Sequence, residues 1–94
     1  MKNKITKDRM EKYLKITKEA LDKVKNSEID KKRKEFAEDL LDMSQRYYDD
    51  ALHYHKKGDW VTAFAAVNYS HAWLDAGARI GLFKVVDNRL FTVD

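Results

Sequence analysis

The sequence contains no cysteine and no proline, and it has only three glycines. Without cysteine there is no disulfide, no thiolate ligand for a metal and no thiol nucleophile. Without proline, no residue forces a helix to break, so long uninterrupted helices are favoured. No apolar run approaches the ~20 residues of a membrane span, so we expect no association with a membrane.

The N-terminus lacks a recognisable targeting signal. Residues 1–5 lead directly into charged side chains, without the apolar segment of a signal peptide. The absence of cysteine suits a reducing compartment, so a cytoplasmic protein is expected. Ninety-four residues are enough for one domain.

The net charge of +3 is unevenly distributed. Residues 1–34 hold 13 basic and 6 acidic side chains, a balance of +7, whereas residues 35–94 hold 6 and 10, a balance of −4. One interpretation is a polar molecule that steers an acidic partner toward its basic end. The other is a set of solvated helix faces whose charges partly neutralise each other.

The first helix is predicted over residues 7–25. Thr6 can cap its N-terminus, and Asn26 and Ser27 mark its end. Apolar or small side chains recur at alternating steps of four and three, which predicts one face packed against another helix. The repeat consists of Met10, Leu14, Thr17, Leu21 and Val24.

The second helix is predicted over residues 28–57, with Ser27 as its N-cap and Gly58 in the left-handed conformation that ends it. It carries two adjacent apolar faces, so it should have two helical neighbours. One face holds Ile29, Phe36, Leu40, Met43, Tyr47 and Tyr54, and the other holds Ala37, Leu41, Ser44, Tyr48, Ala51 and His55.

The third helix is predicted over residues 60–82, capped by Asp59. It is apolar on nearly every side, so it should lie centrally in the bundle or in an oligomer interface. Its small residues would allow close approach of another backbone; they are Ala63, Ala66, Ser70, Gly77 and Gly81. The predicted fold is all-α, a three-helix bundle of antiparallel helices like those of spectrin repeats.

A tail over residues 83–94 follows. Two β-prone runs flank Asp87-Asn88, which predicts either a hairpin or an extended arm over the bundle. Leu90, Phe91 and Val93 should be buried, by the domain itself or by a partner. Leu90 and Phe91 are therefore candidate interface residues.

The third helix carries one polar line, formed by His71, Asp75 and Arg79 at steps of four. Asp75 and Arg79 have the order that favours an intrahelical ion pair. The line could be a ligand or partner site in which Arg79 binds an anion and Asp75 orients it. It could equally be an ion pair that ties the helix to its neighbours.

Aromatic side chains gather around the predicted turn at Gly58. Folding there brings Tyr47 and Tyr48 level with Tyr69, so Tyr48 and Tyr69 are candidate members of a stacking site for a base or cofactor. The alternative is that the rings belong to the core or its boundary. Asp50-x-x-His53 has the spacing of carboxylate-bridged metal sites, but no second pair accompanies it. We expect no metal site and no cofactor.

Several segments resemble a family of short archaeal proteins catalogued as domain of unknown function number 357. The segments are 48–51, 58–59, 63–66, 69–83 and 90–91, with Leu74-Asp75-Ala76-Gly77-Ala78-Arg79 as the most specific piece. The resemblance implies a short three-helix bundle of archaeal, cytoplasmic origin. It implies no activity.

Two functions follow from these patterns. The first is a non-enzymatic module that binds another protein or forms a homodimer, because the third helix has more apolar surface than so small a bundle needs. The second is a nucleic-acid or nucleotide-binding protein that uses the basic first helix. No glycine-rich phosphate loop and no recognised serine or cysteine nucleophile motif is present, so an enzyme is not expected.

Overall fold

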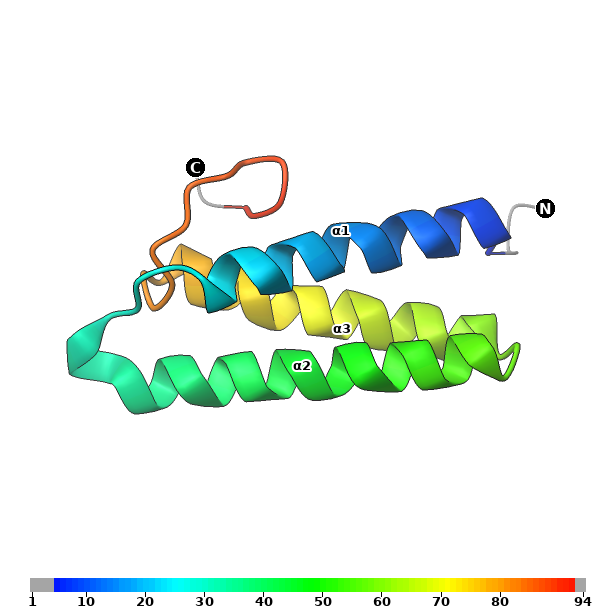
Figure 1. The fold of residues 1–94 in the computed structure, drawn as a ribbon, viewed down its shortest axis with the longest axis horizontal. Helices are drawn as coiled ribbons and strands as arrows, with labels where there is room; N and C mark the ends of the chain where they lie inside the picture. Colours follow the sequence, from blue (N-terminus) through cyan, green and yellow to red (C-terminus); the bar gives the residue numbers. More distant parts are fainter. Residues whose placement is uncertain (1–4, 93–94) are drawn as a thin grey trace.

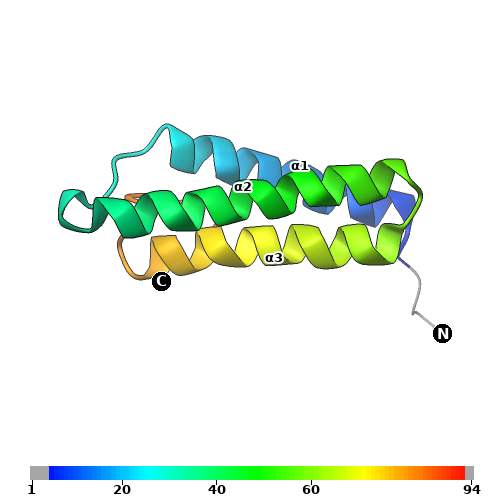
Figure 2. The same ribbon diagram turned by 90° about the horizontal axis from the view of Figure 1, so that it is seen from below.

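The computed structural model describes residues 5–92 and consists of three long helices and a tail (Figure 1). The elements are α1 (Lys7–Lys25), the short 3₁₀ helix η1 (Lys31–Arg33), α2 (Lys34–Lys56) and α3 (Trp60–Arg79). The predicted all-α three-helix bundle is confirmed. Each long helix runs along the 45 Å axis of the molecule, and the other extents are 24 and 19 Å. Viewed from below, α2 and α3 lie side by side with α1 behind them (Figure 2).

Helix α1 has the predicted bounds. The Thr6 hydroxyl accepts a hydrogen bond from the backbone N–H of Arg9 at 3.1 Å, which satisfies one of the free donors of the first turn. Every member of the predicted four-three repeat is buried, together with Ala20. The local pattern therefore selected both the ends and the inward face of this helix.

The predicted start of the second helix is wrong. Ser27 does not cap it; its hydroxyl donates to the carbonyl of Val24 and so closes the end of α1. Residues 28–30 are extended, because Ile29 pairs with Phe83 of the tail. The Asp30 N–H donates to the Leu82 carbonyl at 2.9 Å. This pairing with a segment about 50 residues away outweighs the local preference for helix.

Asp30 acts as an N-cap in this region, and the helix that it caps is η1. Its carboxylate accepts from the Lys32 N–H at 3.0 Å and from Arg33 Nε at 2.6 Å. The hydrogen bond from Arg33 is the largest cause that lowers the pKa of Asp30. Arg33 also donates to the carbonyl of Ile80 at 3.0 Å, so this corner joins the start of α2 to the end of α3.

The predicted turn between α2 and α3 is confirmed. Gly58 has φ +82°, the left-handed conformation that ends α2, and it has room because nothing lies within 4 Å of where a Cβ would stand. The Asp59 carboxylate accepts from the Thr62 N–H at 3.1 Å and caps α3. Hydrogen bonds from Thr62 lower the pKa of Asp59.

Helix α3 ends at Arg79, three residues before the predicted end. Gly81, with φ +79°, is the left-handed residue after the helix, and the Leu82 N–H donates back to the Gly77 carbonyl at 2.8 Å. The other glycine, Gly77, allows the close approach that its size predicted. The group that approaches is the ring of Phe83 from the tail, which a Cβ at Gly77 would overlap.

In the part that the structure describes, the tail forms no hairpin and corresponds to the other predicted alternative, an arm that lies over the bundle. After an extended stretch, its chain turns at Asp87, whose carbonyl accepts from the N–H groups of Leu90 and Phe91 at 3.1 and 2.8 Å. Figure 1 shows the tail looping over the C-terminal half of α1. Leu82, Phe83, Val85, Leu90 and Phe91 are buried there. Two predictions lie outside the described residues. They are the burial of Val93 and the lack of a signal peptide in residues 1–4.

Candidate functional site

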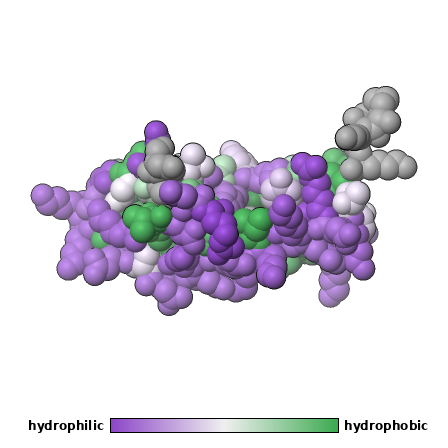
Figure 3. Space-filling view, turned by 90° about the horizontal axis from the view of Figure 1, so that it is seen from above, coloured by the Kyte–Doolittle hydropathy of each residue, from purple (hydrophilic) through white to green (hydrophobic). Residues whose placement is uncertain are grey.

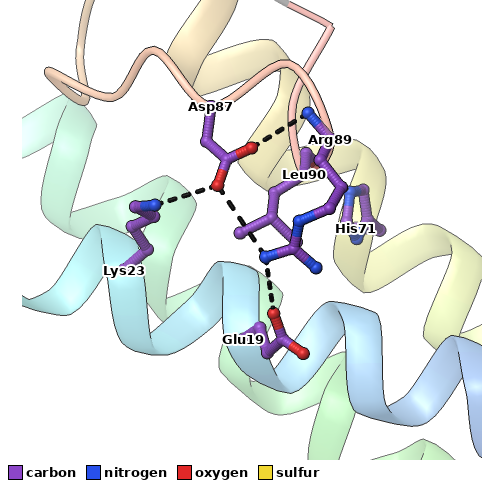
Figure 4. A network of polar contacts seen from close by, with 6 residues as sticks. All are labelled: Glu19, Lys23, His71, Asp87, Arg89 and Leu90. Carbon is purple, nitrogen blue, oxygen red and sulfur yellow. Dashed lines mark hydrogen bonds and ion pairs between the residues drawn. The ribbon is translucent and has the colours of Figure 1, made fainter.

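His71 joins three parts of the fold. From α3, its Nδ1 lies 3.0 Å from the Thr17 hydroxyl of α1, and its Nε2 lies 2.6 Å from the backbone carbonyl of Leu90 in the tail. The carbonyl can only accept, so Nε2 carries the proton, and Nδ1 of the neutral ring accepts from the hydroxyl. Figure 4 shows the imidazole beside Leu90. Both ring nitrogens are therefore engaged inside the protein.

Asp75, one turn further along α3, also binds the tail. Its carboxylate accepts from the backbone N–H of Thr92 at 2.9 Å, with the Thr92 hydroxyl 3.5 Å from its second oxygen. The ion pairs of residues 5–92 do not include one between Asp75 and Arg79. The polar line was interpreted either as a ligand site or as a structural contact. For His71 and Asp75 the structure shows structural contacts, because both side chains bind the backbone of the tail.

A charged network holds the turn of the tail on α1 (Figure 4). The Asp87 carboxylate accepts from Lys23 Nζ at 2.9 Å and from the Arg89 N–H at 2.9 Å. The Arg89 guanidinium lies 2.9 Å from Glu19 and 3.9 Å from Asp87. The hydrogen bond from Lys23 lowers the pKa of Asp87, and the one to Glu19 raises the pKa of Arg89.

Leu90 and Phe91, expected at an interface, are instead buried within their own chain. Leu90 is 3% exposed and Phe91 is 2% exposed. The Phe91 ring lies 6.5 Å from the His71 ring, at an interplanar angle of 29°. The tail covers the groove between α1 and α3, so these side chains offer no surface to a partner.

A small cleft of about 260 Å³ remains beside this docking site. It is lined by Tyr13, Ile16, Asn68, His71, Ala72 and Asp75. The groups that could transfer a proton there are the His71 nitrogens and the Asp75 carboxylate, and each already has a partner in the chain. The geometry favours a structural use of these residues over catalysis.

The candidate pair Tyr48 and Tyr69 does not come together. Tyr48 is 8% exposed, on the side of α2 that faces α1, and burial raises the pKa of its hydroxyl. Tyr69 is 51% exposed and packs on Tyr47 with ring centroids 4.5 Å apart. Consecutive helical residues point about 100° apart, so only one of two neighbouring tyrosines can face Tyr69.

The side of the α2–α3 pair opposite α1 carries a stripe of apolar side chains that we call the outer α2/α3 face. The contacts of α1 with α3 run through Phe64 and His71, whereas Tyr69 and Trp73 lie on the other flank of α3. The face comprises Phe36, Leu40, Met43, Tyr47 and Tyr54 of α2, Ala66, Tyr69, Trp73 and Ala76 of α3, and the adjoining Ile80.

Several of these side chains are open to solvent. Phe36 is 65% exposed, Tyr69 is 51% exposed and Ile80 is 55% exposed. By contrast, the face formed by α1 and the tail is mostly hydrophilic, with small apolar patches (Figure 3). The α2 members of the stripe were predicted as one apolar face. The exposure of Phe36 was missed, because a periodic pattern does not say whether a neighbour covers it.

Two hollows lie along the outer α2/α3 face. The larger, of about 520 Å³, is lined by Met43, Arg46, Tyr47, Asp49 and Asp50. The smaller, of about 240 Å³, is lined by Tyr47, Asp50, Tyr54, Thr62, Ala65, Ala66 and Tyr69. Across residues 5–92, no three His, Asp or Glu side chains gather as a metal site requires. None of the helices there combines the length and apolar character needed to cross a bilayer.

The class of protein defined by this fold is a small helical bundle in which a helical hairpin presents apolar side chains to solvent. The family described as "Protein of unknown function (DUF357)" matches residues 12–83, and the chain belongs to that family. The resemblance found in the sequence is thereby confirmed. No curated protein and no solved structure matches the chain.

Proposed function

We propose that this protein is a non-enzymatic interaction module that associates with a second copy of itself through the outer α2/α3 face. The observation that carries the proposal is the exposure of Phe36, Tyr69 and Ile80, which helical periodicity places on the same side of the α2–α3 pair. Removing such side chains from water is the main favourable contribution to protein association. The absence of cysteine supports a cytoplasmic setting for this association.

The uncharged α3 part of the face is compatible with a second copy as the occupant. In a two-fold symmetric contact the same patch meets itself, so a strongly charged patch would face its own like charges. The α3 part of the stripe carries no formal charge, and the only acid of α3, Asp75, lies on the flank that binds the tail. The patch can therefore pair with itself without burying an unmatched charge on α3.

The size of the face is also suitable. Helices of about 20 residues are about 30 Å long, and two packed helices are about 20 Å wide. A surface of this size is close to the roughly 800 Å² per partner that stable interfaces bury. The tail and α1 lie on the other side of the bundle and would not obstruct the contact (Figures 1 and 2).

Sedimentation equilibrium of the full chain tests this proposal. We expect a concentration-dependent dimer, with the dissociation constant of Tyr69→Glu and of Ile80→Glu raised at least about tenfold. Lys15→Glu, which changes an exposed position of α1, is the matched control and should leave the dimer unchanged. A wild-type chain that stays monomeric at all concentrations would contradict the proposal.

The nucleic-acid alternative is less well supported. Lys7, Lys18 and Lys23 form ion pairs with acidic side chains. The one aromatic residue of α1, Tyr13, packs against Phe64 of α3, with ring centroids 5.1 Å apart, and so presents no stacking surface. Salt-dependent RNA binding by the full chain, reduced by reversing several α1 charges, would favour this alternative instead.

A further inference from the structure

The smaller hollow of the outer α2/α3 face gathers three tyrosines at the end of the bundle near Gly58. Tyr47 and Tyr54 come from α2 and Tyr69 from α3, and all three line the hollow of about 240 Å³. The Tyr47 and Tyr69 rings are 4.5 Å apart at an interplanar angle of 56°, so they are not stacked flat on each other. Ala65 and Ala66 complete the wall with small side chains that leave the space open.

The same hollow contains one carboxylate, that of Asp50. Two other acids of α2 are matched: Asp42 accepts from Arg46 at 2.8 Å, and Asp49 accepts from Gln45 at 2.9 Å. The exposed Asp50 carboxylate has no hydrogen bond and no ion pair with any other of residues 5–92. A negative charge without a partner therefore lies beside the aromatic rings.

This combination is selective for an organic cation. The faces of aromatic rings carry negative charge density and attract ammonium and guanidinium groups, and Arg is the more frequent partner. A carboxylate adds direct attraction and can bind a guanidinium through two hydrogen bonds. A neutral side chain would remove Asp50 from water without compensation, and an anion would be repelled.

We infer that the hollow of Tyr47, Tyr54, Tyr69 and Asp50 binds the cationic side chain of an arginine or lysine presented by another protein chain. Its volume suits one side chain rather than a larger ligand. The inference rests on the proposed function in taking the outer α2/α3 face as the contact surface. It further specifies that the partner must place a cationic side chain at the end of the face near Gly58.

The probe is N-acetyl-arginine amide, titrated into the full chain and followed by two-dimensional NMR. Its neutral analogue, N-acetyl-citrulline amide, has nearly the same shape without the charge. We expect saturable shifts confined to the hollow, with binding of the arginine derivative at least about fivefold tighter than that of citrulline. Equal binding of the two compounds, or no binding at all, would overturn the inference.

Variants assign the effect to the named side chains. Asp50→Asn should reduce the preference for arginine over citrulline about fivefold, and Tyr69→Ala should weaken binding of both derivatives. Asp39→Asn, which removes another exposed α2 carboxylate outside the hollow, should change neither. The NMR spectrum of each variant shows directly whether it remains folded. Loss of arginine selectivity in Asp39→Asn as well would show a non-specific charge effect and contradict the inference.

Dimer measurements on the same variants identify the source of the cation. If Asp50→Asn weakens both probe binding and the dimer, the side chain comes from the second copy. If the dimer is unchanged while probe binding is lost, the side chain belongs to a different protein. A chain that binds the arginine derivative selectively but never dimerises would retain this inference and remove the proposed self-association.

Discussion

Ser44 of α2 and Ser70 of α3 each donate a hydrogen bond from the side-chain hydroxyl to the backbone carbonyl of the other, at 2.9 and 2.7 Å. Both residues are fully buried. The two bonds cross the interface in opposite directions, so a slip of either helix breaks both. They determine the register of the α2–α3 pair, and that register sets which side chains meet on the outer α2/α3 face.

We predict that Ser44→Ala and Ser70→Ala each lower the free energy of unfolding by about 1–2 kcal/mol. Each change removes one buried hydrogen bond between the helices, while the carbonyl that accepted it keeps its donor within the helix. Urea denaturation measures the loss, and Glu38→Ala, an exposed change on α2, is the control. A double variant whose loss equals the sum of the single losses would show that the serines act independently, contrary to the shared register.

Gly77→Ala should be more destabilising than Gly58→Ala. At Gly77 the new methyl group would overlap the Phe83 ring, which is itself buried, so we expect a loss of at least about 2 kcal/mol. At Gly58 only the left-handed backbone opposes alanine, a cost of about 1 kcal/mol, because the surrounding space is empty. Phe83→Leu should partly rescue Gly77→Ala. Thermal unfolding of wild type, Gly58→Ala, Gly77→Ala and the double variant Gly77→Ala/Phe83→Leu measures these losses of stability. A larger loss for Gly58→Ala than for Gly77→Ala would contradict the contact between Gly77 and Phe83.

His71→Ala should release the end of the tail without unfolding the bundle. The change leaves the Leu90 carbonyl without its donor and should cost about 1–3 kcal/mol. Hydrogen exchange of the Thr92 amide, which donates to Asp75, should become faster, whereas amides in the middle of α2 stay protected. Asn68→Ala, at an exposed position one turn earlier in α3, should leave the Thr92 amide protected.

The neutral His71 ring should be in the Nε2–H form, because a backbone carbonyl faces that nitrogen. Nitrogen-15 NMR of the imidazole reports the tautomer directly. The Nδ1–H form would mean that the ring does not bind Leu90 as the structure shows.

The Asp87 network should make the attachment of the tail sensitive to acid. Lys23 lowers the pKa of Asp87 below its ordinary value, so the folded state favours the ionised carboxylate. The resulting stabilisation is present above the unfolded-state pKa and is lost as the pH falls through the lowered folded-state pKa, on the acid side of the ordinary carboxyl range. Asp30 and Asp59 have pKa values lowered in the same direction and should contribute to the same acid limb.

The variant that tests this network is Asp87→Asn, followed by chemical denaturation at a series of pH values. It should be less stable than wild type at neutral pH, and the difference should narrow below pH ~4. Asp39→Asn, at an exposed position of α2, should follow the wild-type curve. A stability difference for Asp87→Asn that does not depend on pH would show that the carboxylate charge is not what holds the turn.

Interactions between near neighbours in the chain could be predicted from the sequence. The cap at Thr6 and the turn at Gly58-Asp59 join atoms within five residues of one another, so residue type determines them. The inward face of α1 follows from a repeat that only a helix can bury on one side. The family resemblance was confirmed by a match over residues 12–83, which includes the α2–α3 segments on which most of it rests.

Interactions between distant parts of the chain decided the rest. Ser27 has the chemistry of a helix cap, but the pairing of Ile29 with Phe83 keeps residues 28–30 extended and moves the start of α2 to Lys34. The polar line on α3 was visible in the sequence. Its partner was not, because Leu90 and Thr92 reach it only after the tail has folded back. The adjacent Tyr47 and Tyr48 point to different sides of α2, and only the packing of α1 determines which of them is buried.

The sequence by itself determined three helices, the position of the hairpin and the division into apolar and charged faces, because backbone geometry and side-chain periodicity act over a few residues. Only the tertiary structure decided that the tail closes the groove between α1 and α3 and that the outer α2/α3 face stays open. Whether an apolar stripe is covered depends on where distant segments pack. Distant segments can pack on one apolar surface or on another, and the local sequence pattern does not specify which surface they cover.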